Sequence, residues 1–293
     1  MMKSYLIVIA ILLKGQLAFC QVKSVLIDSK TKEKISYVNI WVENENIGTT
    51  SNDSGEFELN LADTKKIIVF SAIGYTTKKM VAGDIGNIIE LIPNIIVLQE
   101  VFIRPKKDTK ELVIESFKKS ETNHFFVGGT TPWIVAKYFT YEDNYKTTPY
   151  LKKIRIITNS EIRQASFNIR LYSVNENGDP GEYLYDKNII GVAKKGKTIT
   201  EVDLSGLNIQ FPENGFFIAY EWLIIESNKY EFTYTRQGSN EKFKGIRYEP
   251  GIGTFIGNEQ KNSWTYIKGG WYKWIGQNEG KYRFLAIELT LTN

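Results

Sequence analysis

The amino-acid sequence predicts an all-β protein built from two sandwich domains, and three observations carry this prediction. Short runs rich in β-branched and aromatic residues recur about every 8–12 residues, with turn residues between them. Residues 165–174 alternate, with Phe167 and Ile169 on one face and Asn168 and Arg170 on the other. Only 7 of the 293 residues are proline, so long disordered regions are not expected.

Residues 1–20 are predicted to form a signal peptide. Lys3 gives a positive start, an apolar core follows, and Ala18-Phe19-Cys20 is a small-x-small cleavage site before Gln21. The apolar run is too short to span a membrane. The alternative is a lipoprotein anchored through Cys20, but lipidation favours a small residue where Phe19 stands. We therefore expect cleavage between Cys20 and Gln21, export to the periplasm, outer-membrane periphery or cell surface, and peripheral membrane association at most.

The charge balance argues against a nucleic-acid partner. The chain has 37 Lys and Arg against 33 Asp and Glu. Loss of Lys3 and Lys14 with the signal peptide leaves 35 basic against 33 acidic residues, a net charge of +2. This charge is too balanced to argue for a nucleic acid or an anionic membrane surface as a partner. Cys20 is the single cysteine, so the mature chain is expected to have no disulfide.

Residues 21–98 are predicted to be the first domain. The expected strands cover residues 22–27, 35–42, 48–51, 56–61, 66–71, 88–91 and 95–98. The polar segment from Asn52 to Gly55 is interpreted as a hairpin turn, in which Gly55 supplies a positive φ. A calcium loop is the alternative, but only the first few oxygen ligands of such a loop are present.

The segments Gly48–Leu59 and Val69–Tyr75 carry a resemblance to a known family. Their pattern of strand, polar turn with glycine, strand, loop and strand resembles the carboxypeptidase-like regulatory domain, which is common in surface and periplasmic proteins of Bacteroidetes. The resemblance implies a seven-stranded transthyretin-like β-sandwich, an envelope location and no catalytic activity in this domain. Leu98–Ile103 resembles the strand that closes this domain before other modules, including TonB-dependent receptors.

Residues 99–130 are predicted to be a linker that contains a short helix. Asp108 can cap a helix over residues 109–119, in which Leu112, Val113 and Phe117 form an apolar stripe.

Residues 131–293 are predicted to form a second, jelly-roll-like β-sandwich. The expected strands cover residues 154–158, 165–174, 188–192, 198–204, 216–225, 254–256 and 282–291. Phe167–Tyr172, Asp179-Pro180-Gly181 and Glu221-Trp222 resemble the module that often follows the regulatory domain. That resemblance implies no particular activity.

The residues available for catalysis are few. His124 is the only histidine, so a zinc carboxypeptidase, which needs two histidine ligands, is excluded by residue count. A Ser-His-Asp triad would need His124 as its base, and its linker position favours a structural or exposed histidine. Asp203, Glu221 and Glu288 remain candidates for a carboxylate-based hydrolase. A capped turn or an ion pair is the commoner explanation for such carboxylates.

The densest aromatic cluster lies near the C-terminus. Trp264, Trp271 and Trp274 are interleaved with Lys268, and two tyrosines lie among them. Exposed tryptophans can stack on sugar rings while a neighbouring polar group binds a hydroxyl, so these four residues are the candidate ligand contacts. The alternative is that the rings fill the core of the sandwich.

Three functions remain. The first is a non-enzymatic envelope or secreted binding protein, for a glycan or another envelope component. The second is an assembly or accessory module of an outer-membrane machine of the TonB-dependent transport type. The third is a carboxylate-based hydrolase. No cofactor and no metal site are expected.

Overall fold

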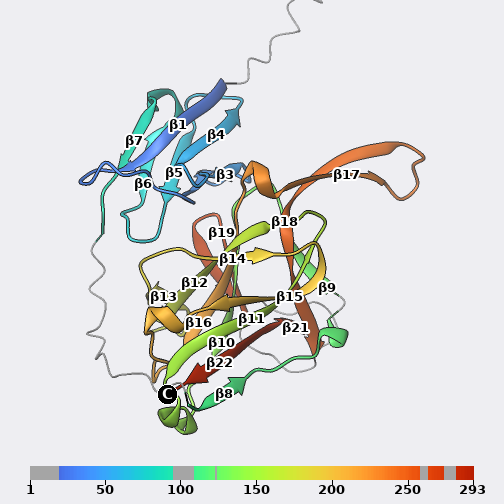
Figure 1. The fold of residues 1–293 in the computed structure, drawn as a ribbon. Helices are drawn as coiled ribbons and strands as arrows, with labels where there is room; N and C mark the ends of the chain where they lie inside the picture. Colours follow the sequence, from blue (N-terminus) through green and yellow to red (C-terminus); the bar gives the residue numbers. More distant parts are fainter. Residues whose placement is uncertain (1–19, 95–108, 123, 258–262, 274–281) are drawn as a thin grey trace, which may run out of the picture.

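The computed structural model describes residues 20–94, 109–122, 124–257, 263–273 and 282–293, which fold into two β-domains (Figure 1). The all-β prediction is confirmed, because the regular elements are strands joined by turns and short 3-10 helices. These helices are η1 (Ala82–Asp84), η2 (Lys119–Glu121), η3 (Asp143–Thr147), η4 (Ser205–Leu207) and η5 (Glu226–Asn228).

The N-terminal domain is a sandwich of two small sheets. One sheet has the strand order β4 (Glu56–Leu61), β1 (Cys20–Asp28) and β7 (Ile88–Leu91). The other has the order β3 (Gly48–Thr50), β2 (Asn39–Val42), β5 (Ile67–Ser71) and β6 (Lys78–Val81). β4 alternates between exposed and buried positions, so Phe57, Leu59 and Leu61 meet Ile40 and Phe70 of the facing sheet in one core.

The C-terminal domain is a larger sandwich whose described strand pairs are all antiparallel. Its seven-stranded sheet contains β13 (Pro180–Tyr183), β12 (Ala165–Val174), β16 (Phe216–Trp222), β10 (Ile134–Phe139), β19 (Ser263–Ile267) and β20 (Gly270–Lys273), with β14 (Ile189–Ala193) beside β12. Its eight-stranded sheet contains β17 (Lys229–Thr235), β18 (Lys242–Gly257), β11 (Tyr150–Ser160), β22 (Ile287–Thr292) and β8 (Glu111–Ile114), with β15 (Gly196–Asp203), β21 (Tyr282–Leu285) and β9 (His124–Gly128) alongside.

The main core of this domain lies between its two sheets. Phe167, Ile169 and Tyr220 from the seven-stranded sheet share one cluster with Ile154 and Leu289 from the eight-stranded sheet. The seven-stranded sheet is also covered on its other face, where a second cluster contains Phe217 and Trp264. A sheet that is buried on both faces has no solvated polar side. Polar side chains on its outer face are therefore buried, and they form the site described below.

The predicted helix over residues 109–119 is wrong. Residues 111–114 form strand β8, which pairs with the C-terminal strand β22, placing Leu112 opposite Leu291 and Ile114 opposite Leu289. Leu112 and Ile114 pack against the main core, whereas Val113 points outward. The segment carries period-two apolar positions as well as a helical stripe, and the open edge of β22 decides between them.

The turn at Gly55 has the predicted positive φ, at +71°. Its prediction as a hairpin is wrong, because the two flanking strands, β3 and β4, lie in different sheets. The side chain of Asn52 organises the turn by accepting hydrogen bonds from the backbone N–H groups of Ser54 and Glu56, each at 2.9 Å. The turn therefore carries the chain from one layer of the sandwich to the other.

Replacing Gly55 by valine is expected to destabilise the N-terminal domain by about 1–3 kcal/mol or more. A β-branched residue is strained at this φ, and a Cβ atom would lie 2.8 Å from the carbonyl oxygen of Leu26. Thermal unfolding of the full chain measures the loss. Gly86→Val is the matched control, because Gly86 lies in the same domain with open space around it. Equal melting temperatures for the two variants would contradict the prediction.

Several predictions lie outside the described residues. These are the signal peptide before residue 20, the strand over residues 95–98 and the receptor-like strand around Glu100–Phe102. At the predicted cleavage position, the backbone of Cys20 begins β1 opposite Leu61. None of the helices in the part of the chain that the structure describes has the length and apolar character needed to cross a membrane.

Candidate functional site

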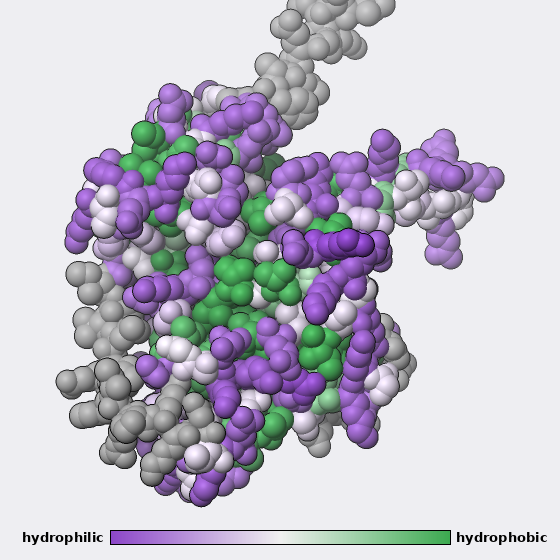
Figure 2. All heavy atoms as spheres, viewed as in Figure 1, coloured by the Kyte–Doolittle hydropathy of each residue, from purple (hydrophilic) through white to green (hydrophobic). Residues whose placement is uncertain are grey.

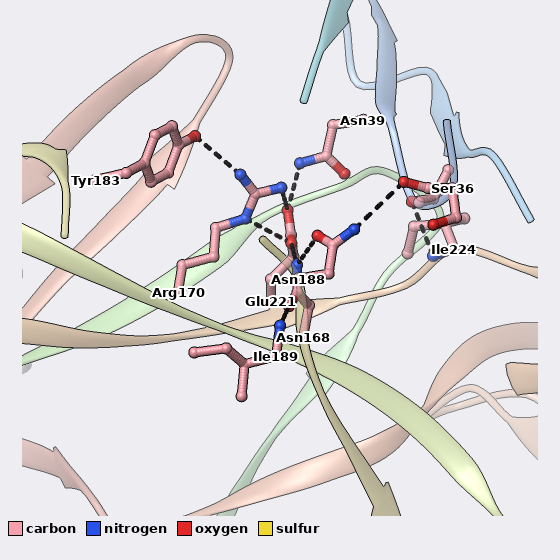
Figure 3. A network of polar contacts seen from close by, with 10 residues as sticks. Ser36, Asn39, Asn168, Arg170, Tyr183, Asn188, Ile189, Glu221 and Ile224 are labelled. Atoms are coloured by element: carbon pink, nitrogen blue, oxygen red, sulfur yellow. Dashed lines mark hydrogen bonds and ion pairs between the residues drawn. The ribbon is translucent and has the colours of Figure 1, made fainter. Parts of the chain in front are cut away.

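The two domains meet at a buried polar network centred on Glu221 of β16 (Figure 3). The Glu221 carboxylate accepts hydrogen bonds from Arg170, through Nε at 2.6 Å and Nη2 at 2.7 Å. It also accepts from the side-chain amide of Asn168, at 2.8 Å, and from Asn39 of β2 in the N-terminal domain. One carboxylate thus receives donors from both domains, and the arginine binds it in a bidentate manner.

The network lies on the outer face of the seven-stranded sheet, under the N-terminal domain. The register of β12 and β16 places Asn168 opposite Glu221. Glu221 is 0% exposed and Arg170 is 2% exposed. Burial opposes the positive charge of Arg170, but the attraction of Glu221, the nearby tyrosines and the hydrogen bond outweigh it and raise the pKa of Arg170 well above its ordinary value. The Arg170 guanidinium therefore stays charged although it is out of contact with solvent.

A second set of contacts joins the domains through Thr50 of β3 and Ile224, which follows β16. The N–H of Thr50 donates to the carbonyl oxygen of Ile224 at 3.2 Å, and the N–H of Ile224 donates to the Thr50 hydroxyl at 3.0 Å. Gly48 lies so close to Pro132 that a Cβ atom would come within 2.7 Å of the proline ring. A Cβ atom would also lie 2.6 Å from the carbonyl oxygen of Ile40 in the same domain, so a side chain at position 48 would clash both within its own domain and with the C-terminal domain.

Beside these contacts, a groove of about 890 Å³ opens between the domains. This volume lies within the range of about 300–1,000 Å³ that is usual for ligand sites. The groove is lined from the N-terminal domain by β1, β3 and β4, and from the C-terminal domain by the segment after β16, η5 and the start of the β17–β18 hairpin. Its residues come from distant parts of the chain, so the docking of the domains creates it.

The two walls of the groove differ in chemistry. The N-terminal domain contributes mainly polar side chains, including Asn60 and Asn87, whose side chains are exposed. The C-terminal domain contributes mainly apolar and aromatic side chains, including Ile225, Ile246 and Tyr248, together with the charged pair Glu226 and Lys229. Burial raises the pKa of the Tyr248 phenol, so this side chain remains a neutral hydrogen-bonding group at ordinary pH.

The structure places the described candidate ligand contacts in different environments. Trp264 is 3% exposed, packs edge-on against Phe217 at 4.9 Å and donates its indole N–H to Asp179. Trp264 is therefore a packing residue and offers no face to a ligand. Trp271 is half-buried, with its ring 5.2 Å from that of Tyr172. Trp274 lies outside the described residues.

The fourth candidate, Lys268, lies in the tight turn between β19 and β20, next to the N-terminal domain. A Cβ atom on the neighbouring Gly269 would contact the ring of Trp41 at 3.8 Å. The cavity that Lys268, Trp41 and Trp133 share is about 10 Å³, which is room for about one water molecule. A sugar ring does not fit there, so this part of the aromatic cluster lies in a domain contact.

The candidate carboxylates have structural partners. Glu221 belongs to the buried network, and Glu288 accepts from Arg155 at 2.6 Å. Asp203 accepts the backbone N–H of Ser205 at 2.9 Å, as a turn cap does. His124 is exposed at the start of β9. Across the described ranges, no group of three His, Cys, Asp or Glu side chains is placed to hold a metal ion.

Comparison with known proteins identifies the N-terminal domain. Residues 23–103 match the model of the CarboxypepD_reg-like domain family. The N-terminal domain is a carboxypeptidase-like regulatory domain. A domain of this family is regulatory and non-catalytic. The regulatory domain supplies β1, β3 and β4 to the groove, and Asn39 to the Glu221 network.

The other comparisons add no relative. No curated protein matches the chain. A solved structure described as "Structure of infectious bursal disease virus Gx strain" is 8% identical, with a TM-score of 0.21. The likeness covers 93% of this chain, which spans 59% of that one, and at this TM-score it says nothing about fold or function.

Proposed function

We propose that this chain is a non-enzymatic binding protein of the cell envelope, and that its ligand is a glycan held in the groove between the regulatory domain and the C-terminal domain. The observation that supports this proposal is the groove itself, with a volume of about 890 Å³ and walls from both domains. The N-terminal segment with its signal-peptide pattern supports the envelope location.

The unlike walls of the groove favour a sugar. A glycan has hydroxyl groups at its edges and apolar C–H groups on its ring faces. Amide side chains such as those of Asn60 and Asn87 can both donate to and accept from hydroxyls. Ile246, which is 43% exposed, and Tyr248 can cover a ring face on the other side. This arrangement provides both kinds of contact within one groove.

The acidic side chains Glu58 and Glu226 in the groove are paired with lysines, which favours binding over hydrolysis. Glu58 lies 2.9 Å from the Lys23 amine, and Glu226 lies 3.4 Å from the Lys229 amine. Each of these carboxylates is held by a lysine of its own wall, whereas glycoside hydrolysis needs two carboxyl groups that flank one glycosidic bond. These pairs are suited to binding hydroxyl groups by accepting hydrogen bonds.

Removing the amides of the polar wall is expected to weaken glycan binding about tenfold. The double variant Asn60→Ala with Asn87→Ala removes two exposed amides, each contributing about 0.5–1.5 kcal/mol to a hydrogen-bonded ligand. The backbone carbonyl of Asn87, which accepts from Val25, is kept. A glycan array identifies the ligand of the full chain, and titration calorimetry then compares the variants.

Asn177→Ala is the matched control, because Asn177 is an exposed amide in the turn before β13, away from the groove lining. The control is expected to bind as the unchanged chain does. Equal binding by the double variant would show that the ligand lies elsewhere. If the unchanged chain retained no glycan at all, the proposed ligand class would be wrong.

A further inference from the structure

The β17–β18 hairpin leaves the body of the C-terminal domain as a projecting arm, here defined as residues 229–248 (Figure 1). Its strands pair with each other from Lys229 opposite Tyr248 to Thr235 opposite Lys242. Within the described part of the chain, no other strand pairs with residues 242–247 of β18, so the edge of β18 opposite β17 is open there. An open edge exposes backbone donors and acceptors to another strand.

The arm is stiffened by a ladder of aromatic rings on one face. Tyr230, Phe232, Tyr234 and Phe243 stand ring beside ring, at centroid distances of 6.4, 5.9 and 5.8 Å. Phe232 also covers Gly245, where a Cβ atom would lie 2.6 Å from its ring. An isolated two-stranded hairpin is marginally stable in water, and these ring contacts stabilise the paired strands of the arm. Because the arm is already ordered, it loses little conformational entropy when it binds a partner strand.

The cations at the base of the arm form ion pairs, whereas those near its tip form none with described residues. At its base, Lys229 pairs with Glu226, and Arg247 pairs with Glu249 at 2.8 Å. Towards the tip, Arg236, Lys242 and Lys244 are exposed and have no carboxylate within ion-pair distance among the described residues. Figure 2 shows the projecting arm as a largely hydrophilic surface. The three cations outnumber the one carboxylate of the tip, Glu241, so the tip carries a net positive charge.

We propose that the arm binds an extended acidic segment of a partner protein, which adds as a strand to the open edge of β18 between Lys242 and Arg247. Side chains alternate along β18, with Lys242, Lys244 and Ile246 on one face and Phe243, Gly245 and Arg247 on the other. A strand of alternating acidic and apolar residues matches this pattern. Its carboxylates lie opposite the lysines, and its apolar side chains lie beside Phe243 and Gly245.

The same lysines disfavour a second copy of this chain as the occupant. Pairing one β18 edge with another would bring Lys242 and Lys244 of both copies together, and like charges in a cross-strand pair are destabilising. Lysine on an open edge is a common protection against self-association. The carboxylates of an acidic strand would instead attract these lysines. This inference does not rest on the glycan groove: the two sites share Ile246, but the lining of the groove includes none of the three tip cations.

Three synthetic peptides of about ten residues, the length of an ordinary strand, test the inference. The first alternates Glu and Val, the second alternates Lys and Val, and the third alternates Glu and Pro, which cannot join a ladder. Of the three peptides, only the Glu-Val peptide is expected to bind to the full chain. Its affinity is expected to fall as ionic strength rises. The variant R236E/K242E/K244E is expected to lose at least about tenfold in affinity.

The control variant K65E/K194E/K195E makes the same charge change at exposed lysines outside residues 229–248, and it is expected to bind as the unchanged chain does. R236Q/K242Q/K244Q gives a neutral version, should charge reversal unfold the arm. Equal binding of the Glu-Pro peptide would overturn strand addition. The proposal would also be overturned if an acidic polysaccharide displaced the Glu-Val peptide, or if the chain formed a dimer through the arm. Failure of the chain to bind any of the peptides would overturn it as well.

Discussion

Replacing Glu221 by alanine is expected to lower the free energy of unfolding by about 3–5 kcal/mol. The change removes the carboxylate that Arg170 binds with two hydrogen bonds, and it leaves the guanidinium buried at 2% exposure with no counter-charge in contact. Asn39 and Asn168 lose an acceptor at the same time. Chemical denaturation of the full chain, followed by fluorescence and circular dichroism, measures the loss.

Glu201→Ala is the matched control for this prediction. Glu201 pairs with Lys153 at 3.3 Å on an exposed strand face, where a salt bridge contributes little, so near-unchanged stability is expected. The double variant R170M/E221M removes both charges and should recover part of the loss, because apolar side chains of similar size can replace a buried ion pair. If Glu221→Ala unfolded at the same denaturant concentration as Glu201→Ala, the network would have no stabilising function.

Replacing Trp264 by alanine is expected to cost about 3–5 kcal/mol of stability, as for other buried tryptophans. The ring fills the second core cluster against Phe217, and its indole N–H bonds to Asp179 at 2.9 Å. A cavity and an unpaired Asp179 oxygen would remain. The melting temperature of the full chain should fall clearly, whereas glycan binding at a temperature below the transition should be unchanged.

Trp271→Ala is the comparison, because Trp271 belongs to the same aromatic cluster but is only half-buried. Less surface is removed from water at this position, so a smaller loss of stability is expected. The packing role of Trp264 would be contradicted if the Trp264→Ala variant kept its melting temperature but no longer bound a glycan that the unchanged chain retains.

The candidate site was the part least accessible to prediction from sequence. Arg170 stands on the polar side of the alternating strand at residues 165–174, a pattern that alone predicts a solvated face, and Glu221 stands at the end of the largely apolar run at residues 216–222. They are buried because the regulatory domain covers that face and supplies Asn39. The groove has no local signal either, because residues such as Asn60 and Ile246 become neighbours only when the domains dock.

The sequence by itself determined the elements that depend on short-range chemistry. Alternation over residues 165–174 predicted β12 with its bounds, and the need for positive φ at Gly55 was readable from the polar turn. The pattern around residues 48–75 indicated the regulatory domain that the family comparison then showed. In these cases a local preference of the backbone, or a period of two along a strand, is sufficient to specify the structure.

Only the tertiary structure decided the outcomes that depend on long-range contacts. The segment at residues 111–114 became a strand because β22 offered an open edge, although it also carries a helical stripe. Trp264 became core because the sheet that holds it is covered on both faces. The arm projects because residues 230–235 and 242–247 pair with each other and with no further described strand. Burial and strand pairing are properties of the whole fold, and local sequence specifies them weakly.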